Sequence, residues 1–165
     1  MLTARLEVRL PCPADRARFV ELFRDDGFMI FSGGPLNVEA ARQRFDNMLD
    51  RAAEIPFAKQ PVVERCSGTI IGYAGADWLK VERQRRLEFG YRLVPEARGK
   101  GYATEAGHAL VELAAQTFCG ELVVVIHPKN RASIATSERL GFRYWKHAPV
   151  QGEGRYIGRR QIGER

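Results

Sequence analysis

The amino-acid sequence predicts an α/β fold in which a largely antiparallel sheet contains one parallel step. Two patterns predict it: short stretches rich in β-branched and aromatic residues, and longer stretches with apolar residues at helical spacing. Strand-like stretches follow one another through residues 61–94 with no helix between them, which is typical of antiparallel pairing. Residues 87–126 then alternate strand, helix and strand, and such a crossover predicts a parallel pair.

The first 60 residues predict one strand and two helices. Residues 6–10 alternate apolar and charged side chains, as a half-buried strand does. A short helix is expected up to about residue 26, followed by a loop over residues 27–35 with an apolar insert at residues 28–31. Asn37 is a suitable N-cap for a second helix. The apolar face of that helix contains Ala41, Phe45, Met48, Leu49 and Ala52.

Residues 61–94 predict three consecutive strands. The first two, residues 61–64 and 69–78, are joined by a turn at residues 66–68. A charged connection at residues 80–86 leads to the third strand, residues 87–94. We expect this connection to be a solvated hairpin tip, because four of its side chains are basic.

The remaining residues predict two helices and three strands. Residues 103–117 carry apolar side chains at helical spacing, and residues 122–126 fit a strand that is buried on both faces. Ser133 is expected to cap a short helix that ends at Leu140-Gly-Phe142, with the glycine in the left-handed conformation. A strand is expected at residues 142–145 and a weaker one at residues 155–157. The basic end, residues 155–165, is expected to be solvated.

Composition bounds the class of protein. A chain of 165 residues fits one domain, expected to span residues 1–165, and 45% apolar with 28% charged residues is typical of a globular protein. No apolar run approaches the roughly 20 residues that a membrane span needs, so no membrane partner is expected. The first ten residues do not build the apolar core of a signal peptide. The sequence therefore predicts a cytoplasmic protein.

Metal and nucleic-acid chemistry are not indicated. The three cysteines form no CxxC pair and the three histidines have no ligand spacing, so no metal site is expected. The net charge of +6 favours an anionic partner. Nucleic acid is an unlikely partner because the basic residues are scattered along the chain.

Residues 98–104 are the segment most informative about chemistry. Gly99 and Gly101 leave main-chain amides uncovered just before a predicted helix, whose N-terminus adds unpaired donors and positive dipole charge. Arg98 and Lys100 add positive charge at the same place. The pattern predicts a site for a pyrophosphate group. The alternative is a glycine turn with two solvated basic side chains.

Two common phosphate motifs fit this segment poorly. A Walker A loop needs Ser or Thr directly after Gly-Lys, where this sequence has Gly101. A dinucleotide-binding motif needs a small residue where Thr104 stands, and it follows a parallel sheet rather than an antiparallel one.

The segment Arg98-x-x-Gly101-x-Ala103 resembles the Arg/Gln-x-x-Gly-x-Gly/Ala loop of the GNAT superfamily of acetyl-CoA-dependent N-acyltransferases. Thr3-x-Arg5-Leu6-x-x-Arg9 is similar to the opening of its ribosomal-protein alanine N-acetyltransferase branch. Further motifs follow in the order of that branch over residues 3–145. They are Glu88-Phe-Gly90-Tyr91, Pro95-Glu96, Ala103-Thr-Glu-Ala106, Asn130-x-x-Ser133 and Leu140-Gly-Phe142.

The resemblance implies a mixed, mostly antiparallel sheet flanked by helices, with acetyl-CoA bound between two splayed parallel strands that end at Val94 and Ile126. Backbone groups of Leu93 and Val94 would pair with the pantetheine arm, and Asn130 with Ser133 would bind it from the other side. Asn130 could equally be a turn former. The residues expected at the pyrophosphate are Arg98, Gly99, Lys100, Gly101, Tyr102, Ala103 and Thr104.

The resemblance also implies transfer of an acetyl group to a primary amine by direct attack in a ternary complex. Such a reaction needs a base for the amine, a donor for the thioester oxygen and an acid for the leaving thiolate. The N–H of Tyr91 would meet the thioester oxygen, and Glu88 is the candidate base through water, or else an exposed strand glutamate. Ser137 stands where many members carry a tyrosine acid, and it would orient CoA or a water.

The acceptor site is expected at the first two helices and the loop between them, with Phe28 and Phe31 forming an apolar rim. The same two residues could simply pack the helices together. The acceptor would be a small-molecule amine or a protein N-terminus, and the protein a monomer or a homodimer. A non-catalytic acyl-CoA-binding or sensor domain is the alternative function.

Overall fold

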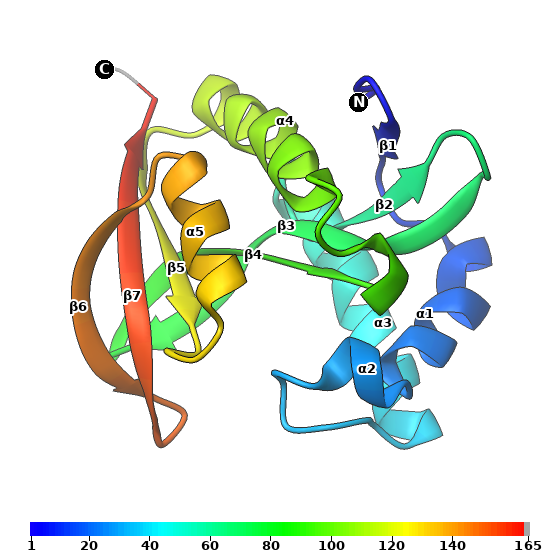
Figure 1. Ribbon diagram of the computed structural model, residues 1–165, viewed down its shortest axis with the longest axis horizontal. Helices are drawn as coiled ribbons and strands as arrows, with labels where there is room; N and C mark the ends of the chain where they lie inside the picture. Colours follow the sequence, from blue (N-terminus) through cyan, green and yellow to red (C-terminus); the bar gives the residue numbers. More distant parts are fainter. Residues whose placement is uncertain (164–165) are drawn as a thin grey trace.

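The computed structural model describes residues 1–163, in which one seven-stranded sheet has helices on both faces (Figure 1). The strand order is β1-β2-β3-β4-β5-β7-β6, and every neighbouring pair except β4 with β5 is antiparallel. The strands are β1 (Leu6–Val8), β2 (Gln60–Glu64), β3 (Thr69–Val81), β4 (Gln84–Leu93), β5 (Gly120–Ile126), β6 (Arg143–Val150) and β7 (Glu153–Ile162). The helices are α1 (Arg16–Phe23), α2 (Asp26–Met29), α3 (Val38–Glu54), α4 (Tyr102–Thr117) and α5 (Arg131–Arg139). The predicted mixed sheet with one parallel step is confirmed.

Strands β4 and β5 separate soon after they pair. Their parallel register covers only Leu87 with Leu122 and Glu88 with Val123, although β4 continues to Leu93 and β5 to Ile126. Figure 1 shows β5, β6 and β7 turned away from the plane of β3 and β4. The splayed parallel pair expected from the resemblance is therefore present.

The two faces of β4 look onto different layers of the molecule. Leu87, Phe89 and Leu93 are buried in one core cluster with the inner face of α4. The side chains of Glu88 and Arg92 lie on the other face, because successive residues of a strand point to opposite sides. That face is covered by α1, α2 and α3, whose apolar side chains pack around Tyr73 of β3.

The core of the α1–α3 layer follows the predicted helical face. Ala41 and Phe45 of α3 are fully buried, and Phe45 stacks on Phe19 of α1 with ring centroids 5.3 Å apart. The side chain of Asn37 caps α3 by accepting a hydrogen bond from the amide of Ala40 at 2.8 Å. Sequence periodicity and capping chemistry therefore located this helix well.

Several expected boundaries are wrong for identifiable reasons. Residues 26–29 form α2 rather than part of a loop, because the Asp25 side chain accepts a hydrogen bond from the amide of Phe28 and caps a helical turn. The β3–β4 hairpin needs only Glu82 and Arg83 to turn, so its strands extend through most of the expected charged connection. Asn130, rather than Ser133, caps α5, since its Oδ1 accepts from the Ser133 amide at 3.1 Å.

The chain end is also more ordered than expected. Strand β7 pairs with β5 along its length, with Ile162 opposite Gly120 and Tyr156 opposite Ile126. Most of the expected solvated tail is therefore a strand inside the sheet. The last two residues of that expected tail lie outside the described residues.

Candidate active site

The glycine loop presents an open N-terminus of α4. Gly101 is the N-cap of this helix with φ +80°, and Gly99 has φ +74°. A Cβ added at Gly99 would meet no atom within 4 Å, and one at Gly101 would meet only Arg5 Nη2 at 3.4 Å. In residues 1–163, no acceptor receives a hydrogen bond from the amides of Gly99, Lys100 or Gly101. Main-chain donors are thus exposed at the positive end of a helix, as an anionic ligand requires.

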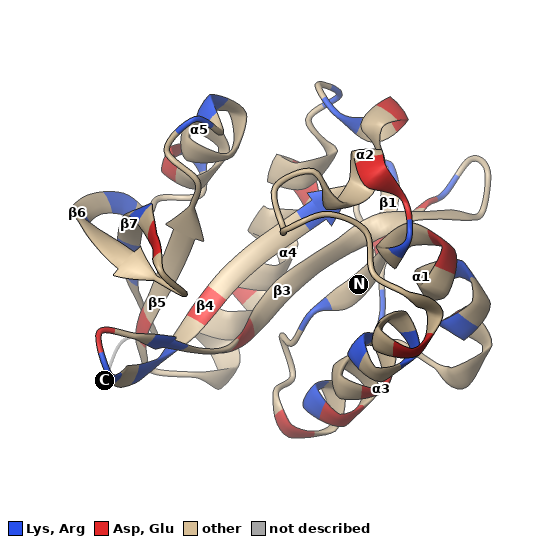
Figure 2. Cartoon of the chain, turned by 90° about the horizontal axis from the view of Figure 1, so that it is seen from below, with Lys and Arg blue, Asp and Glu red and all other residues tan. Residues whose placement is uncertain are grey.

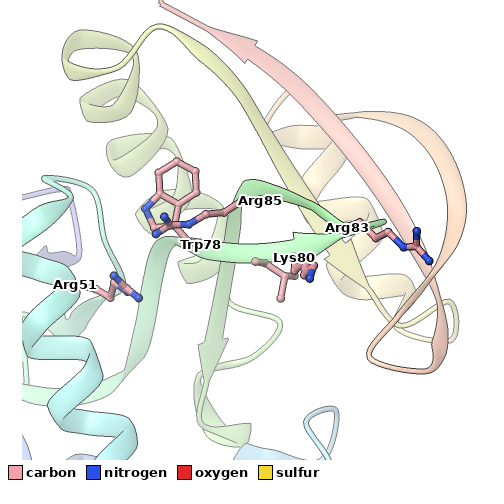
Figure 3. Close-up of a pocket in the computed structure, with 6 residues that line it drawn as sticks. Arg51, Trp78, Lys80, Arg83 and Arg85 are labelled. Atoms are coloured by element: carbon pink, nitrogen blue, oxygen red, sulfur yellow. The ribbon is translucent and has the colours of Figure 1, made fainter.

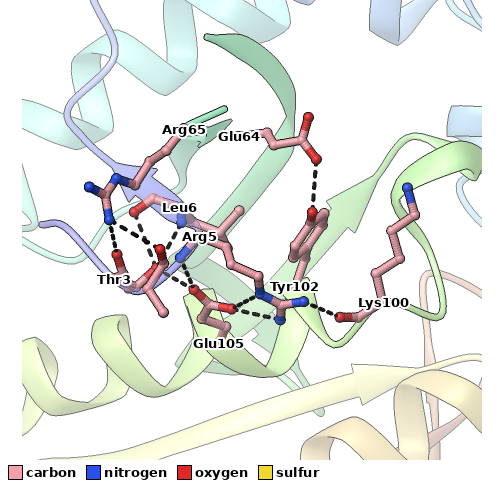
Figure 4. Close-up of polar contacts among 9 residues, drawn as sticks. Thr3, Arg5, Leu6, Glu64, Arg65, Lys100, Tyr102 and Glu105 are labelled. Carbon is pink, nitrogen blue, oxygen red and sulfur yellow. Dashed lines mark hydrogen bonds and ion pairs between the residues drawn. The ribbon is translucent and has the colours of Figure 1, made fainter. Parts of the chain in front are cut away.

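A polar cluster on the N-terminal segment holds this loop in place (Figure 4). Arg5 reaches Glu105 in the first turn of α4 through Nε and Nη2, at 2.8 and 2.7 Å from Oε2. Its Nη1 also donates to the carbonyl of Lys100 at 2.9 Å. Thr3 donates to Glu105 Oε1 at 2.6 Å. The cluster therefore fixes the loop carbonyl and neutralises the carboxylate nearest to the open amides.

The protonation of Glu105 links this cluster to pH. Burial alone would raise the pKa of Glu105, but hydrogen bonds from Thr3 and Arg5 outweigh it and hold that pKa below the ordinary value of 4.5. A lowered native pKa means that the folded state binds the proton less tightly than the unfolded chain does. The resulting stability is complete above pH 4.5 and is lost as the pH falls through the native pKa.

We expect Glu105→Gln to lower the free energy of unfolding by roughly 1 kcal/mol at pH 7, and by progressively less as the pH falls toward 3. Urea unfolding at a series of pH values measures this difference. Glu112→Gln, an exposed change on the same helix, is the control and should give a pH-independent difference near zero. A constant deficit for Glu105→Gln at every pH would show that the lost carboxylate carries no linked proton.

Two side chains expected at the pyrophosphate have other partners. Arg98 donates through Nε to the carbonyl of Leu93 at 3.1 Å and through Nη2 to that of Gly27 at 2.6 Å. The Tyr102 hydroxyl donates to Glu64 Oε1 at 2.8 Å. Both side chains therefore brace the loop from behind in this structure.

The backbone of Val94 does not have the role expected for it. Its amide donates to Ile71 of β3 at 2.9 Å and its carbonyl accepts from Ala97 at 3.0 Å. Because hydrogen-bonding direction alternates along a strand, the backbone groups of Tyr91 and Leu93 point the other way, into the gap beside β5. These two residues, rather than Val94, offer main-chain groups to a ligand in the gap, although the Leu93 carbonyl already accepts from Arg98.

Polar side chains from α5 line the far side of this gap. The hydroxyls of Tyr91 and Ser133 share a hydrogen bond of 3.1 Å, which joins β4 to the first turn of α5. The Oδ1 of Asn130 is used by its cap, which leaves the amide nitrogen of this side chain as its donor. The turn-forming role of Asn130 is therefore real, and its NH2 group can still serve a ligand.

Glu88 lies on the opposite face of β4 beside a basic partner. Its Oε2 is 3.3 Å from Lys59 Nζ, and the Glu88 side chain is only 15% exposed. A Cβ at Gly90 would meet Glu88 Oε1 at 2.8 Å, so a glycine there leaves room for the carboxylate. Burial works against the charge of Lys59, but Glu88, Tyr73 and Asp77 together outweigh it and raise the pKa of Lys59. Glu88 is therefore not the exposed strand glutamate of the alternative interpretation.

Ser137 is buried, and its hydroxyl is already committed. It donates to the carbonyl of Ile134 at 2.8 Å within α5. The nearby Tyr156 hydroxyl is the one buried side-chain oxygen or nitrogen in residues 1–163 that has no hydrogen-bond partner. Burial, chiefly, raises the pKa of Tyr156, while its contact with Ser137 works in the other direction. The sequence did not indicate Tyr156, because it follows no motif and comes from the distant strand β7.

The expected apolar rim divides into a core residue and a surface residue. Phe28 is 1% exposed and packs against Phe23 and Tyr73, which is the packing alternative. Phe31 is 50% exposed, and its ring lies 6.5 Å from that of His127, just after β5. Of the two, only Phe31 is therefore exposed, beside the residue that follows β5.

Two surface hollows are also present, and the second borders Gly27 and Val94. One, of about 400 Å³, lies between α3 and the β3–β4 hairpin, and the other, of about 300 Å³, lies between α1 and Pro95. The first is lined by Arg51, Trp78, Leu79, Lys80, Arg83 and Arg85 (Figure 3). The guanidinium of Arg85 covers the Trp78 ring at 4.5 Å, so that aromatic face is not free for stacking with a ligand.

The charges of the chain are intermixed over its helices. Figure 2 shows both basic and acidic residues along α1 and α3. This distribution differs from the one-sided basic stripe of a nucleic-acid-binding domain. Within residues 1–163, no helix is both long and apolar enough to cross a membrane.

An open helix N-terminus beside splayed parallel strands is the arrangement that a CoA thioester would need, and comparison with known proteins agrees. The family model described as "Acetyltransferase (GNAT) domain" matches residues 5–143. The chain therefore belongs to the GNAT acetyltransferase family, and it is an acetyltransferase by that membership. Members use acetyl-CoA as the acyl donor.

Two curated relatives show how far the sequence likeness extends. The uncharacterized protein YkkB of Bacillus subtilis is 27% identical over 143 residues, which cover 84% of this chain and 83% of the relative. The L-methionine sulfoximine/L-methionine sulfone acetyltransferase of Pseudomonas aeruginosa is 32% identical over 100 residues, which cover 58% of each chain.

Two solved structures share the fold. A GNAT-family acetyltransferase from Bordetella pertussis is 20% identical with a TM-score of 0.86, covering 97% of this chain and 98% of that one. The ribosomal-protein-S5-alanine acetyltransferase of Vibrio fischeri is 19% identical with a TM-score of 0.80, covering 98% and 96%. At these identities the likeness is one of fold alone.

Proposed function

We propose that this protein transfers the acetyl group of acetyl-CoA to a primary amine, of a small molecule or a protein N-terminal residue, within one domain spanning residues 1–165. The observation that carries the proposal is the set of unpaired amides at Gly99, Lys100 and Gly101 beside the gap between β4 and β5. The continuous sheet from β1 to β7 supports a single domain. The exposed thiols of Cys12, Cys66 and Cys119 suit a reducing compartment such as the cytoplasm.

The residues present fit acetyl-CoA at this site. The amides of residues 99–104 would hold the pyrophosphate, Lys100 would add a mobile charge, and Arg98 would keep the loop attached to Leu93 and Gly27. Main-chain groups of Tyr91 and Leu93, with Asn130 and Ser133 opposite, would bind the pantetheine arm. When bound, acetyl-CoA supplies an acyl thioester that is activated toward amines.

The chain would contribute three functions to the transfer. The Tyr91 N–H points into the gap and would stabilise negative charge on the thioester oxygen. The face of β4 that α1, α2 and α3 cover would receive the amine, and we call it the acceptor face. Glu88 lies on this face and would accept the amine proton through water. Ser137 would orient CoA or a water, because its hydroxyl already donates to Ile134 and a serine is a weak acid.

The acceptor could belong to either of two groups. The Thr3-x-Arg5-Leu6-x-x-Arg9 opening and the fold of the ribosomal-protein alanine acetyltransferase support the branch that acts on protein N-termini. The relative named for L-methionine sulfoximine and L-methionine sulfone supports a small amine.

Incubation with acetyl-CoA and an amine panel tests the proposal, with free thiol as the readout. The panel contains alanine- and serine-starting peptides, polyamines, L-methionine, L-methionine sulfone and L-alanine. Thiol release that depends on one class of amine supports the proposal. Acetyl-CoA binding with no release above the rate without amine would instead support the acyl-CoA sensor function.

A further inference from the structure

One arginine on the acceptor face of β4 is partly buried without a carboxylate. In residues 1–163, no Asp or Glu oxygen lies within 4.0 Å of the Arg92 guanidinium. Its two terminal nitrogens contact Met29 Sδ and Ser32 Oγ, which are neutral groups. Charged side chains are rarely buried unless an opposite charge pairs with them. A bound anion would therefore be strongly stabilised by the charge of this unpaired guanidinium.

Aromatic rings and charges of both signs surround Arg92, but none of these charges pairs with it directly. Its guanidinium carbon lies 5.5 Å from the Phe28 ring and 5.6 Å from the Tyr73 ring. Burial lowers the pKa of Arg92, and repulsion from Arg44 and Arg98 adds to this effect although Tyr73 and Glu88 oppose it. Arg92 remains charged, because even a lowered arginine pKa lies far above neutrality.

The pKa of Tyr73 is affected by the same charged side chains. It is 3% exposed, and burial would raise the pKa of its hydroxyl. Arg92, Lys59 and Arg44 outweigh burial and lower that pKa instead. The lowered pKa of Tyr73 reflects the positive side chains beside it, which the Glu88 carboxylate opposes.

The position of Arg92 relates it to the acyl site. Arg92 follows Tyr91, whose N–H faces the gap, and it shares a strand face with Glu88 four positions earlier. Gly90 stands between Glu88 and Arg92 on that face and contributes no side chain. Ser32, the neutral partner of Arg92, lies next to the exposed ring of Phe31.

We propose that Arg92 binds an anionic group, chiefly a carboxylate, of the acceptor, so that the substrate is a free amino acid or a similar amine that carries a carboxylate. This inference rests on the proposed acetyl transfer for its reaction, but not for the binding itself. A peptide N-terminus offers a neutral amide where a free amino acid offers a carboxylate. Arg92 thus favours the small acceptor over the protein N-terminus.

The test compares matched acceptors that differ only in this charge. L-Methionine, L-methionine sulfone and L-alanine are each assayed beside their carboxamides, by thiol release and by calorimetric binding to the CoA-saturated protein. In the unsubstituted protein, we expect the carboxylates to exceed the carboxamides by at least about tenfold in kcat/KM or affinity. Arg92→Met should reduce the carboxylate values about 100-fold and the carboxamide values less than about threefold.

Two further variants separate anion binding from damage to the fold. Arg92→Lys keeps the positive charge but lacks the two parallel N–H donors of a guanidinium, and it should retain part of the carboxylate preference. Arg42→Met removes an exposed arginine on α3 and should leave the preference unchanged, as a control for net charge. The CoA-induced rise in Tm should be the same in all variants, because Arg92 lies on the face of β4 opposite to α4.

The outcomes distinguish this inference from the proposed function. Thiol release with equal rates for carboxylates and carboxamides overturns the role of Arg92 and leaves acetyl transfer in place. Carboxylate binding that depends on Arg92 without any thiol release supports the anion site and overturns acetyl transfer. If the carboxylates gain no advantage in rate or in affinity, the inference is wrong.

Discussion

We expect Gly101→Val to weaken acetyl-CoA binding by about 100-fold or more while the protein remains folded. Gly101 has φ +80°, and the region beside it is open except for Arg5 Nη2, which would lie 3.4 Å from an added Cβ. A branched side chain there would project over the amides that the pyrophosphate needs. Left-handed backbone also costs a non-glycine residue about 1–2 kcal/mol, so some loss of stability is expected as well. Calorimetric titration with acetyl-CoA should give a Kd raised by about 100-fold or more.

A second glycine provides a control that separates the effect of backbone strain from the effect of blocking the amides of residues 99–101. Gly152, in the turn between β6 and β7, has φ +83° and no atom within 4 Å of an added Cβ. Gly152→Val should therefore lose similar stability and bind acetyl-CoA normally. If both variants bind acetyl-CoA as the unsubstituted protein does, the amides of residues 99–101 do not form the ligand site, and the acetyl-CoA proposal loses its main support.

The glycine loop could be predicted from sequence because its parts are adjacent in the chain. Gly99, Gly101 and the helix that follows lie within a few positions, so local backbone rules suffice to expect open amides. The same is true of the Asn37 cap and of the left-handed Gly141, whose φ is +82°. The parallel step could also be expected, because a helix lies between the two strands in the sequence and such a crossover is how parallel strands are usually connected.

The acceptor face could not be predicted in the same way. Arg92 meets Met29 and Ser32, which lie 63 and 60 positions earlier, and Glu88 meets Lys59 across 29 positions. No local pattern encodes such pairs, since they depend on how α2 and the start of β2 pack on β4. Conversely, Arg98 has the expected loop position, but its side chain binds carbonyls of Leu93 and Gly27 because α2 packs close to the loop.

Removal of the Glu88 carboxylate should change the pH dependence of the reaction. If Glu88 accepts the amine proton through water, Glu88→Gln removes a function that is needed most while the amine is protonated. We expect kcat to fall about 100-fold near pH 6.5 and less than about threefold near pH 9.5, where more of the amine is already neutral. Single-turnover thiol release from pH 6 to 10 measures the profile without interference from product release.

Glu121→Gln provides a matched control for this change. Glu121 lies on β5, the strand next to β4, accepts from Arg86 at 2.7 Å and is 27% exposed. It is therefore another partly buried carboxylate in an ion pair. Its loss should shift kcat by the same small factor at every pH. If Glu88→Gln instead lowers kcat by the same factor at every pH, Glu88 has a positioning role beside Lys59. The loss of that ion pair would change the local structure of β4 equally at pH 6.5 and 9.5. A fall confined to low pH would support proton transfer to Glu88, because the neutral fraction of the acceptor amine rises across that range.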